Sequence, residues 1–572
     1  MKKIAIVNIM RFGDIIQSLP LMYSIKKEYP QSQIHMIIAN AFSSVCEILP
    51  YVDKFHILDY STLYKLEDNT SKSTALVYEY LRNLVDSLRA EKFDLCINLT
   101  PTNSAIILAK LIHAKKIEGA YFDQNSFRVI TNPWMQYFYV SSLARHQNSI
   151  NIVDMFIKGA GFDVKEYVPY LREKINSNEY GADAYLCVHL GASERKRSMA
   201  PESLAKAAGM ISQETGLGVC LLGVSSEQDL ANRFQEVFKG RCLNLVGKTS
   251  VKELAQVLGA SPLLICHDTG PMHVAWAMGT KVLSVFLATA NPFETGPYGP
   301  GNLVLDPTCA CHPCDHSTTC KTYECKSSIS PYTLAQMALY ILRGDPLPID
   351  PKAVALKVTH DVDGMAEPTP LVPIPWSIER FAMLCWRSVI PPILDGRVDK
   401  ERILHNLKMR VMRFFGIKIE KISELLAQEI GALHEIIGML QLGVKTLCLL
   451  MEETKGNGHW WSRVAQLCGE LMELEKLMLK WAYQHRHWEF PIRMLILSLK
   501  SFPPKADLQY VIRLSLNCYE RAYEQFKVLY QVLNDLIKEG KDGNIGEGRW
   551  KAGYHSPGDH YIGRYPGTCV VP

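Results

Sequence analysis

Two acidic residues stand where strand-like apolar runs give way to helix-like runs. Asp14 follows the apolar run at 4–9, and Asp268 follows a second run at 263–266. Both positions correspond to the carboxyl end of a buried parallel strand, where ligands bind in open α/β sheets. A carboxylate there can take a proton from an attacking hydroxyl. For Asp14 and for Asp268 the structural alternative is an Asp that caps the following helix.

The residues after Asp268 suit the binding of an anion. Thr269 follows directly, Gly270 lets a backbone approach a ligand closely, and Pro271 suits the first position of a helix. His273 lies at the start of the apolar helix that follows. Exposed N–H groups and the dipole at such a helix start attract negative charge.

A basic cluster follows another strand-like run. Ser193 and Glu194 lead into Arg195, Lys196 and Arg197. Cations beside a turn at the carboxyl end of a strand can hold a diphosphate. The alternative is a solvated basic loop, and the position after a strand favours the phosphate interpretation.

The sequence Gly247-Lys248-Thr249-Ser250 resembles the end of a phosphate-binding loop. Cys242 stands where that motif needs its upstream glycine, so a nucleoside-triphosphatase is excluded. Ser250 with Glu253 three residues later instead predicts a capping box.

Five cysteines lie between residues 309 and 325. Cys311, Cys314, Cys320 and Cys325 form a set that can bind zinc or iron tetrahedrally as a structural metal. Their spacing is irregular, and reduced loop thiols without metal are the alternative.

The elements that position these residues alternate between strand and helix. Such alternation predicts α/β architecture with parallel sheets, in two doubly wound halves. We expect an N-terminal Rossmann-like domain at 1–175 and a second at 176–345, followed by a proline-rich linker at 346–376. Three apolar stripes at helical spacing predict an all-helical domain at 377–540, and the Gly- and Tyr-rich tail at 541–572 is expected to be disordered.

Composition narrows the class of protein. The chain has 572 residues, of which 48% are hydrophobic and 21% charged, as in a soluble globular protein of several domains. A net charge of +4 gives no reason to expect nucleic acid as a partner. We expect no secretory signal, no membrane-spanning helix and reduced cysteines in a cytoplasmic protein. The basic amphipathic segment at 400–421 suits either an anionic membrane surface or a bundle.

Together these motifs resemble glycosyltransferase family 9, the bacterial heptosyltransferases of lipopolysaccharide core synthesis. The resemblance covers residues 1–345. Its motifs, in chain order, are Arg11-Phe12-Gly13-Asp14, His189-Leu190-Gly191-Ala192-Ser193, Gly247-Lys248-Thr249-Ser250, His267-Asp268-Thr269-Gly270-Pro271-Met272-His273 and Thr295-Gly296-Pro297-Tyr298-Gly299.

The resemblance implies the GT-B arrangement, in which two Rossmann-like domains face one another, with the helical region as an appendage. It implies inverting sugar transfer that requires no metal cofactor for catalysis, with Asp14 as general base. It also implies a donor site, and the residues that match this site are Ser193, Lys196, Arg197, Glu227, Thr249, Asp268, Thr269, Gly270 and His273. Arg197 aligns better than Lys196 with the family residue that contacts phosphate. By the same resemblance, Glu227 matches a family residue near the donor ribose, and Thr249 falls where the family contacts the adenine.

The implied partners are a nucleotide-sugar donor, ADP-heptose, and a glycolipid or glycan acceptor. Peripheral contact with the cytoplasmic face of the inner membrane and a homo-oligomer formed through the helical domain are further expectations. Two alternatives stay open: the same fold using another nucleotide-sugar donor, and a non-catalytic scaffold whose helical domain binds a partner.

Overall fold

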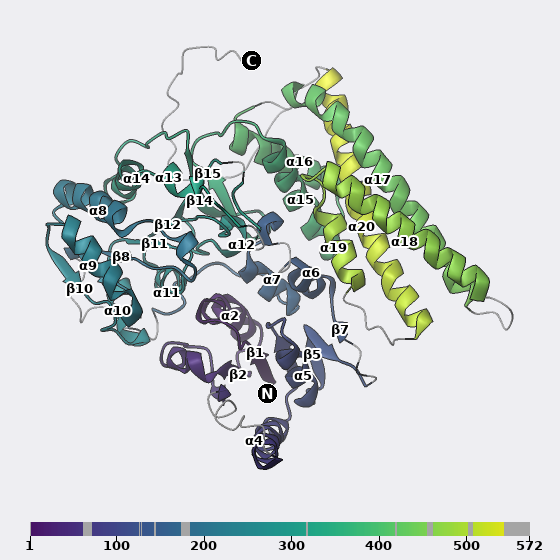
Figure 1. The fold of residues 1–572 in the computed structure, drawn as a ribbon, viewed down its shortest axis with the longest axis horizontal. Coiled ribbons are helices and arrows are strands. Elements are labelled where there is room, and N and C mark those ends of the chain that lie inside the picture. The colour runs from purple at the N-terminus through teal and green to yellow at the C-terminus, as the bar shows by residue number, and fades with distance from the viewer. Residues whose placement is uncertain are drawn as a thin grey trace.

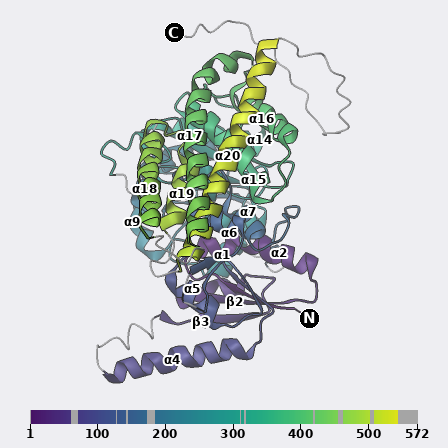
Figure 2. The same cartoon turned by 90° about the vertical axis from the view of Figure 1, so that its right-hand side faces the viewer.

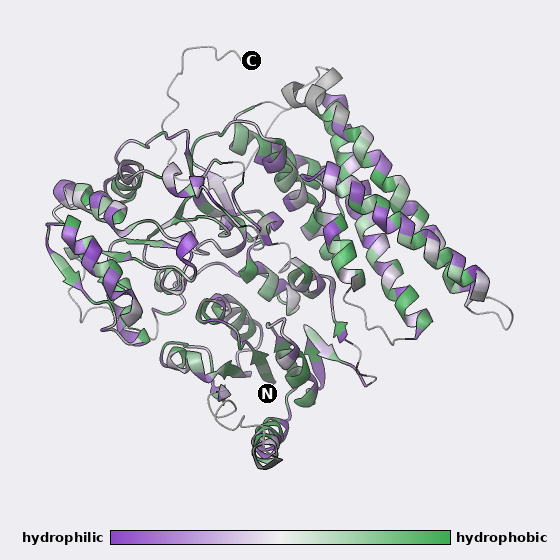
Figure 3. Cartoon of the chain, viewed as in Figure 1, coloured by the Kyte–Doolittle hydropathy of each residue, from purple (hydrophilic) through white to green (hydrophobic). Residues whose placement is uncertain are grey.

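The apolar run near the N-terminus forms β1 (Lys3–Val7), the middle strand of a five-stranded parallel sheet in the order β3-β2-β1-β4-β5. Residues 4–7 of this strand are fully buried, as expected for a strand with helices on both faces of its sheet. Figure 3 shows the strands around β1 as hydrophobic. The other strands of this sheet are β2 (Gln33–Ala39), β3 (Lys54–Leu58), β4 (Leu95–Asn98) and β5 (Lys116–Glu118).

The structure is a computed structural model. It describes residues 2–60, 71–124, 126, 128–141, 145–172, 175, 184–309, 311–315, 319–417, 420–454, 461–500 and 507–542. All of the predicted disordered tail except its first two residues lies outside the described residues.

Helices and a small hairpin complete the N-terminal domain. The segment after β1 forms two helices that meet at Ser18. Figure 2 shows α4 standing away from the body of the domain below β3. The elements are α1 (Phe12–Gln17), α2 (Leu19–Glu28), the 3-10 helix η1 (Asn40–Glu47), α4 (Ser71–Ala90), α5 (Asn103–Leu111), β6 (Ala120–Phe122), β7 (Arg128–Ile130), α6 (Pro133–Ser141), the 3-10 helix η2 (Arg145–Gln147) and α7 (Ile152–Gly159).

The second domain is built on an eight-stranded sheet in the order β10-β9-β8-β11-β12-β13-β14-β15. The strands from β10 to β13 run parallel. They are β8 (Tyr185–His189), β9 (Gly218–Leu222), β10 (Cys242–Asn244), β11 (Leu264–His267), β12 (Val282–Val285) and β13 (Leu303–Pro307). The helices are α8 (Pro201–Thr215), α9 (Gln228–Val237), α10 (Val251–Ala260), α11 (Gly270–Met278), α12 (Pro292–Thr295), α13 (Glu324–Ser328) and α14 (Pro331–Arg343). The two sheets and their helices face one another, which is the GT-B arrangement (Figure 1).

The prediction of a proline-rich linker at 346–376 was wrong. This segment forms β14 (Ala353–His360) and β15 (Ala366–Pro370), an antiparallel hairpin that extends the second sheet beyond β13. Pro368 and Pro370 lie in β15, the edge strand, where a missing backbone N–H costs no hydrogen bond on the open side. The prolines therefore mark a sheet edge and not a flexible connection.

The helical appendage follows this hairpin. The three predicted stripes lie on α17 (Glu420–Glu453), α18 (Trp461–Gln484) and α20 (Leu508–Asp542), which pack side by side (Figure 2). The remaining helices are α15 (Ile378–Leu394), α16 (Lys400–Phe415) and α19 (Phe490–Lys500). Three basic residues of α16 are engaged within the protein: Arg402 pairs with Asp363, Lys408 with Glu539 and Arg410 with Glu367.

In the part of the chain that the structure describes, one helix is long and apolar enough to cross a membrane by length and composition, at Glu429–Glu453 within α17. In this structure α17 packs against α18 and α20, and 44% of its most apolar window is buried inside the protein.

A buried polar network ties the appendage to both domains. The carboxylate of Asp154 on α7 accepts hydrogen bonds from the Tyr298 hydroxyl at 2.9 Å and from the backbone N–H of Ala366 in β15 at 3.0 Å. Arg387 of α15 pairs with Asp361 of the β14–β15 turn at 3.0 Å. Buried charges are stable only when such partners are present. The appendage is thus joined to the α/β part through its interior.

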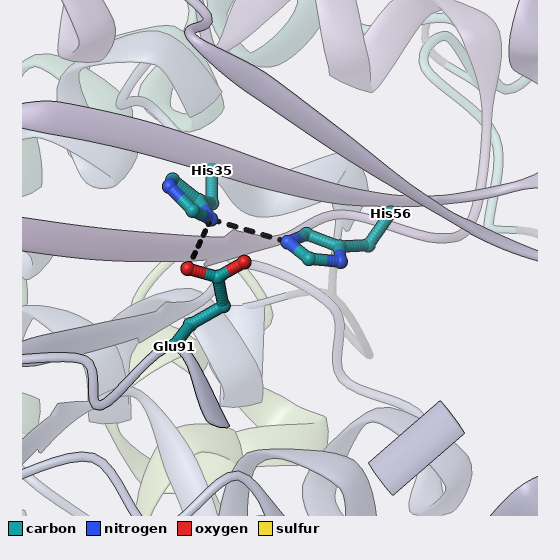
Figure 4. Close-up of side chains that lie close together, drawn as sticks. All are labelled: His35, His56 and Glu91. Carbon is teal, nitrogen blue, oxygen red and sulfur yellow. Dashed lines mark hydrogen bonds and ion pairs between the residues drawn. The ribbon is translucent and has the colours of Figure 1, made fainter. Parts of the chain in front are cut away.

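A second polar cluster lies at the start of the N-terminal sheet (Figure 4). The Nδ1 of His35 on β2 lies 3.1 Å from the Nε2 of His56 on β3 and 4.0 Å from a carboxylate oxygen of Glu91. Lys3 and Lys54 both bind the same carboxylate. Although the spacing of the three groups suits a metal ion, two ammonium groups already neutralise the carboxylate. We therefore interpret the cluster as a closed structural network.

Candidate functional site

A cleft of about 680 Å³ opens between the two domains, where α1 of the first meets α11 of the second. Its walls include most of the predicted site residues. The sequence-predicted residues that line it are Asp14, Ser193, Arg197, Thr249, Asp268, Thr269, Gly270 and His273.

Glycines allow α1 and α11 to approach closely at the floor of this cleft. A Cβ at Gly13 would lie 3.0 Å from the ring of His273, and a Cβ at Gly270 would lie 2.6 Å from the ring of Phe12. The second distance is too short for any real Cβ contact. Each helix therefore places a glycine against an aromatic ring of the other, which brings Asp14 and Asp268 to opposite walls of one cavity.

Asp14 lies in the first turn of α1 and not at its N-cap, which is Arg11. Burial raises the pKa of Asp14, and the Asp268 carboxylate adds to this, while Arg11 and Arg145 lower it. A carboxyl whose pKa is raised is a stronger base once ionised, and catalytic bases are commonly tuned in this way.

His273 is a neutral ring with a defined tautomer. Trp276 donates its indole N–H to Nδ1 of His273 at 3.2 Å, so the ring proton lies on Nε2, the side next to Gly13. Burial lowers the pKa of His273 to about 4. His273 is thus positioned to donate a hydrogen bond into the cleft and is a poor general base for this site.

Arg197 is the buried cation of the basic cluster. Its Nε donates to Thr289 Oγ1 at 2.7 Å, and its terminal nitrogens pair with Asp268 at 3.3 Å and with Glu194 at 3.1 Å. These partners fix the guanidinium beside the start of α11, where the helix dipole also favours an anion.

Two of the predicted donor-site residues do not line the cleft. Lys196 points to Glu194, with 3.0 Å between its Nζ and the carboxylate, so Arg197 is the residue that the structure brings to the site. Glu227 accepts the backbone N–H of Val224 at 2.9 Å and lies 3.8 Å from His189. Its carboxylate fills the space beside Gly191, directly behind the cleft wall at His189 and Val224.

The predicted capping box at the start of α10 is present. Ser250 Oγ accepts the N–H of Glu253 at 3.2 Å, and the Glu253 carboxylate accepts the N–H of Ser250 at 2.7 Å. This box holds Thr249 at the cleft wall.

Arg145 and Glu294 were not predicted from the sequence as site residues. Arg145 of η2 lines the cleft and pairs with Glu294 of α12 at 2.7 Å, and both side chains are largely buried. The pKa of Arg145 is raised by Glu294 first, and also by Asp268 and Asp14. The two partners are 149 residues apart in the chain, and neither belongs to a periodic pattern that would have indicated the pairing.

Three of the predicted metal-binding cysteines, Cys311, Cys314 and Cys320, lie between β13 and α13, and Cys325 lies in α13. Cys314 and Cys325 are buried, Cys320 is partly exposed and Cys311 is exposed. Burial and the neighbouring thiols of Cys311, Cys325 and Cys320 raise the pKa of Cys314 to about 11. Across the described parts of the chain, however, the groups whose ligand atoms come within 4.8 Å of one another are formed by other residues. Thus no three of these four thiols lie within 4.8 Å of one another among the described residues, although the Cys311 and Cys314 side chains are in contact.

The chain is similar in sequence to proteins of known family. Residues 81–324 match the family model described as glycosyltransferase family 9 (heptosyltransferase). The chain is 23% identical over 308 residues to the lipopolysaccharide core heptosyltransferase OpsX of Haemophilus influenzae, a match that covers 52% of this chain and 82% of the relative. The α/β part of the chain therefore resembles glycosyltransferase family 9, and the chain is a glycosyltransferase.

Other proteins are similar to the same part of this glycosyltransferase. Lipopolysaccharide heptosyltransferase 3 of Escherichia coli is 26% identical over 307 residues, which is 50% of this chain and 83% of the relative. Among solved structures, a family 9 glycosyltransferase from Veillonella parvula aligns with a TM-score of 0.47 at 20% identity, over 60% of this chain and 98% of that one. The E. coli heptosyltransferase WaaC with ADP aligns with a TM-score of 0.42 at 17% identity, over 52% of this chain and 91% of that one.

Proposed function

We propose that this glycosyltransferase belongs to family 9 and moves a heptose from ADP-heptose to a lipopolysaccharide-core or related glycan acceptor, with inversion at the anomeric carbon. The observation that supports this proposal is the convergence of Asp14, Arg197, Asp268 and His273 in one cleft. The names of the curated relatives supply the sugar and the class of acceptor.

The proposed reaction is a single displacement. Asp14 takes the proton from an acceptor hydroxyl, and the oxygen forms a bond to the anomeric carbon of the donor. The bond from that carbon to the diphosphate oxygen breaks, and its electron pair stays with the departing nucleoside diphosphate. Arg197 and the N–H groups at the start of α11 stabilise the charge that develops there. This chemistry requires no bound metal, because cationic and dipolar groups of the chain serve the leaving group.

Two variants test the assignment. Asp14→Asn removes the base but keeps the size of the side chain, so transfer should be abolished while donor affinity stays nearly unchanged. Arg197→Ala should mainly weaken donor binding. Normal turnover by Asp14→Asn would remove Asp14 from the mechanism, and unchanged donor affinity in Arg197→Ala would transfer the phosphate role to Lys196 or Arg195.

The identity of the donor is tested by calorimetric titration with ADP-heptose, UDP-glucose, UDP-N-acetylglucosamine and ADP. Tight binding that depends on the heptose supports the proposal. Preference for a uridine donor would favour the alternative of another nucleotide sugar on the same fold. Absence of binding to all four would favour the non-catalytic scaffold.

We also propose that the loop with Cys311, Cys314, Cys320 and Cys325 holds a structural zinc or iron ion. Soft thiolate ligands suit both metals, and the loop already gathers the four side chains. Metal analysis of the reduced protein, compared with a Cys311→Ser and Cys314→Ser variant, tests this. Metal content that is zero, or that is equal in both proteins, contradicts the proposal.

We propose that the appendage self-associates through the outer face of α18. We also propose that the whole enzyme binds peripherally to the cytoplasmic face of the inner membrane. Met472 is 61% exposed and Tyr483 is 75% exposed on that helix, which is unusual for large apolar side chains. Analytical ultracentrifugation of wild type and a Met472→Glu, Tyr483→Glu variant tests the first idea, and flotation with anionic vesicles tests the second. A monomer in both proteins, or no vesicle binding, contradicts the respective proposal.

A further inference from the structure

A second cavity lies where the helical appendage meets the N-terminal domain. This junction cavity has a volume of about 100 Å³. One wall comes from β7 and α6 of the N-terminal domain, and the other comes from α19 and α20, which run beside them (Figure 1). The family 9 match ends well before α19 and α20, so half of this cavity is made by residues outside the family unit.

Among the described residues, the lining of the junction cavity contains two guanidinium groups and no acidic residue. Arg128 projects from β7 and Arg521 from α20. Arg128 donates to the amide oxygen of Asn103 at 2.9 Å, and Arg521 donates to the amide oxygen of Gln136. Within the described residues, neither arginine forms an ion pair with a carboxylate. The Asp123 carboxyl lies near Tyr510, another residue of the lining.

Arg521 is the less usual of the two. Burial lowers the pKa of Arg521, and the neighbour that opposes this effect is the Cys518 thiol and not a carboxylate. The same side chain also lines a smaller adjoining cavity, next to Tyr137 and Gln525. A guanidinium withdrawn from water without a counter-charge is costly, and charged groups of this kind in proteins usually meet an anion.

The remaining lining shows what kind of anion fits. Tyr510, Asn517 and Ser498 offer hydrogen-bonding groups beside the two arginines, while Val129, Ile130 and Leu514 form an apolar wall. Arginine pairs bind planar or tetrahedral oxyanions through several N–H donors at once. The geometry points to an anion-binding site in the junction cavity, in which Arg128 and Arg521 together hold a phosphate or carboxylate group.

The position of the cavity connects it with the acceptor side of the enzyme. It borders α6, whose Tyr139 hydroxyl lies 3.1 Å from the carbonyl oxygen of Thr100 after β4, at the carboxyl edge of the N-terminal sheet. The segment after α6 carries Arg145 into the catalytic cleft. The oxyanion therefore belongs either to an acceptor glycan that reaches past α6 or to a free anion. The acceptor source rests on the proposed transferase function, whereas the anion site itself does not.

Inorganic phosphate is the probe for the site. Titration of the full chain with phosphate is compared among wild type, Arg521→Gln, Arg128→Gln and Arg463→Gln, all in an Arg197→Ala background that weakens phosphate binding in the donor cleft. Arg463 is an exposed arginine on α18 that bonds to Gln466, so its substitution controls for loss of one positive charge. We expect phosphate affinity to fall about tenfold or more in Arg521→Gln and Arg128→Gln and to stay unchanged in Arg463→Gln. Equal affinity in all four proteins would overturn the proposal.

Two additions keep the test decisive. If Arg521→Gln does not fold, Arg521→Lys takes its place, because lysine retains the positive charge. We expect Arg521→Lys to bind phosphate more weakly than wild type but more tightly than Arg128→Gln. The source of the anion is resolved by steady-state transfer kinetics with Arg197 intact. If phosphate raises the KM for the acceptor in wild type but not in Arg128→Gln, the site serves the acceptor. If phosphate binds with no effect on that KM, the site holds a free anion. Loss of transfer with phosphate binding intact would count against the proposed function alone.

Discussion

Arg145 of the N-terminal domain and Glu294 of the C-terminal domain form a buried ion pair across the cleft, with 2.7 Å between Nε and a carboxylate oxygen. Asn291 strengthens the same junction, because its side-chain amide donates to the backbone carbonyls of Arg145 and Asn148 at 2.8 Å each. These contacts hold the segment after α6 against the segment from Asn291 to Glu294. They therefore fix the two domains relative to one another beside the cleft in which the reaction is proposed to occur.

We predict that Arg145→Gln and Glu294→Gln each lower the free energy of unfolding by about 3 kcal/mol or more, because each leaves an unpaired buried charge. The double variant should cost less than the sum of the two, since it leaves no such charge. Urea unfolding of the four proteins measures this. Additive losses would show that the two side chains are not coupled.

The close approach of α1 and α11 gives a second prediction. Gly270→Ala should displace the ring of Phe12, cost about 1–3 kcal/mol through overpacking and reduce transfer. Gly209→Ala in α8 is the matched control, since no atom lies within 4 Å of its added Cβ. The control should be neutral or slightly stabilising, as alanine favours a helix. Equal behaviour of both variants in thermal unfolding and transfer assays would contradict the interlock.

The environment of Asp14 predicts the acid limb of the pH profile. Because burial raises the pKa of Asp14, kcat/KM should fall with decreasing pH at values above the ordinary 3.8 of an aspartate. Arg11 lowers this pKa, so Arg11→Gln should move the acid limb to higher pH. Arg486→Gln, on the distant appendage, should leave the limb in place. An acid limb that moves to lower pH in Arg11→Gln would be inconsistent with Asp14 as the base.

The cluster of His35 and His56 predicts loss of stability in mild acid. Burial lowers the pKa of His35, and burial together with His35 lowers the pKa of His56 to about 4. Above pH 6.5 both rings are neutral in the folded and unfolded chain, so this stability is fully present. Between pH 6.5 and about 4 the two histidines are protonated in the unfolded chain but stay largely neutral in the folded protein. The free energy of unfolding therefore falls as the pH falls.

His56→Gln tests this pH dependence, because glutamine cannot take up the proton. The urea midpoint of wild type should fall more between pH 7.5 and pH 5 than the midpoint of the variant. Identical pH dependence in the two proteins would show that the pair does not titrate as proposed.

The parts of the fold that could be predicted are those encoded by local pattern. The apolar runs before Asp14 and Asp268 became β1 and β11, and the three helical stripes became α17, α18 and α20. The hairpin of β14 and β15 escaped prediction because its prolines are typical of linkers, and only pairing with β13 makes the segment a sheet. In the same way, Arg145 was not predicted because its partner Glu294 is set by a tertiary contact that no local pattern reveals.

The hairpin also decides where this chain can be divided. A truncation at residue 345, where the family resemblance ends, would remove β14, which pairs with β13. The unpaired backbone groups of β13 would then form an exposed sheet edge, which favours aggregation. A cut at 377 would keep the hairpin but leave Asp361 without Arg387. The appendage is therefore joined to the α/β domains through buried contacts and not through a flexible linker. We expect the smallest unit that can be expressed as one folded piece to extend through α20.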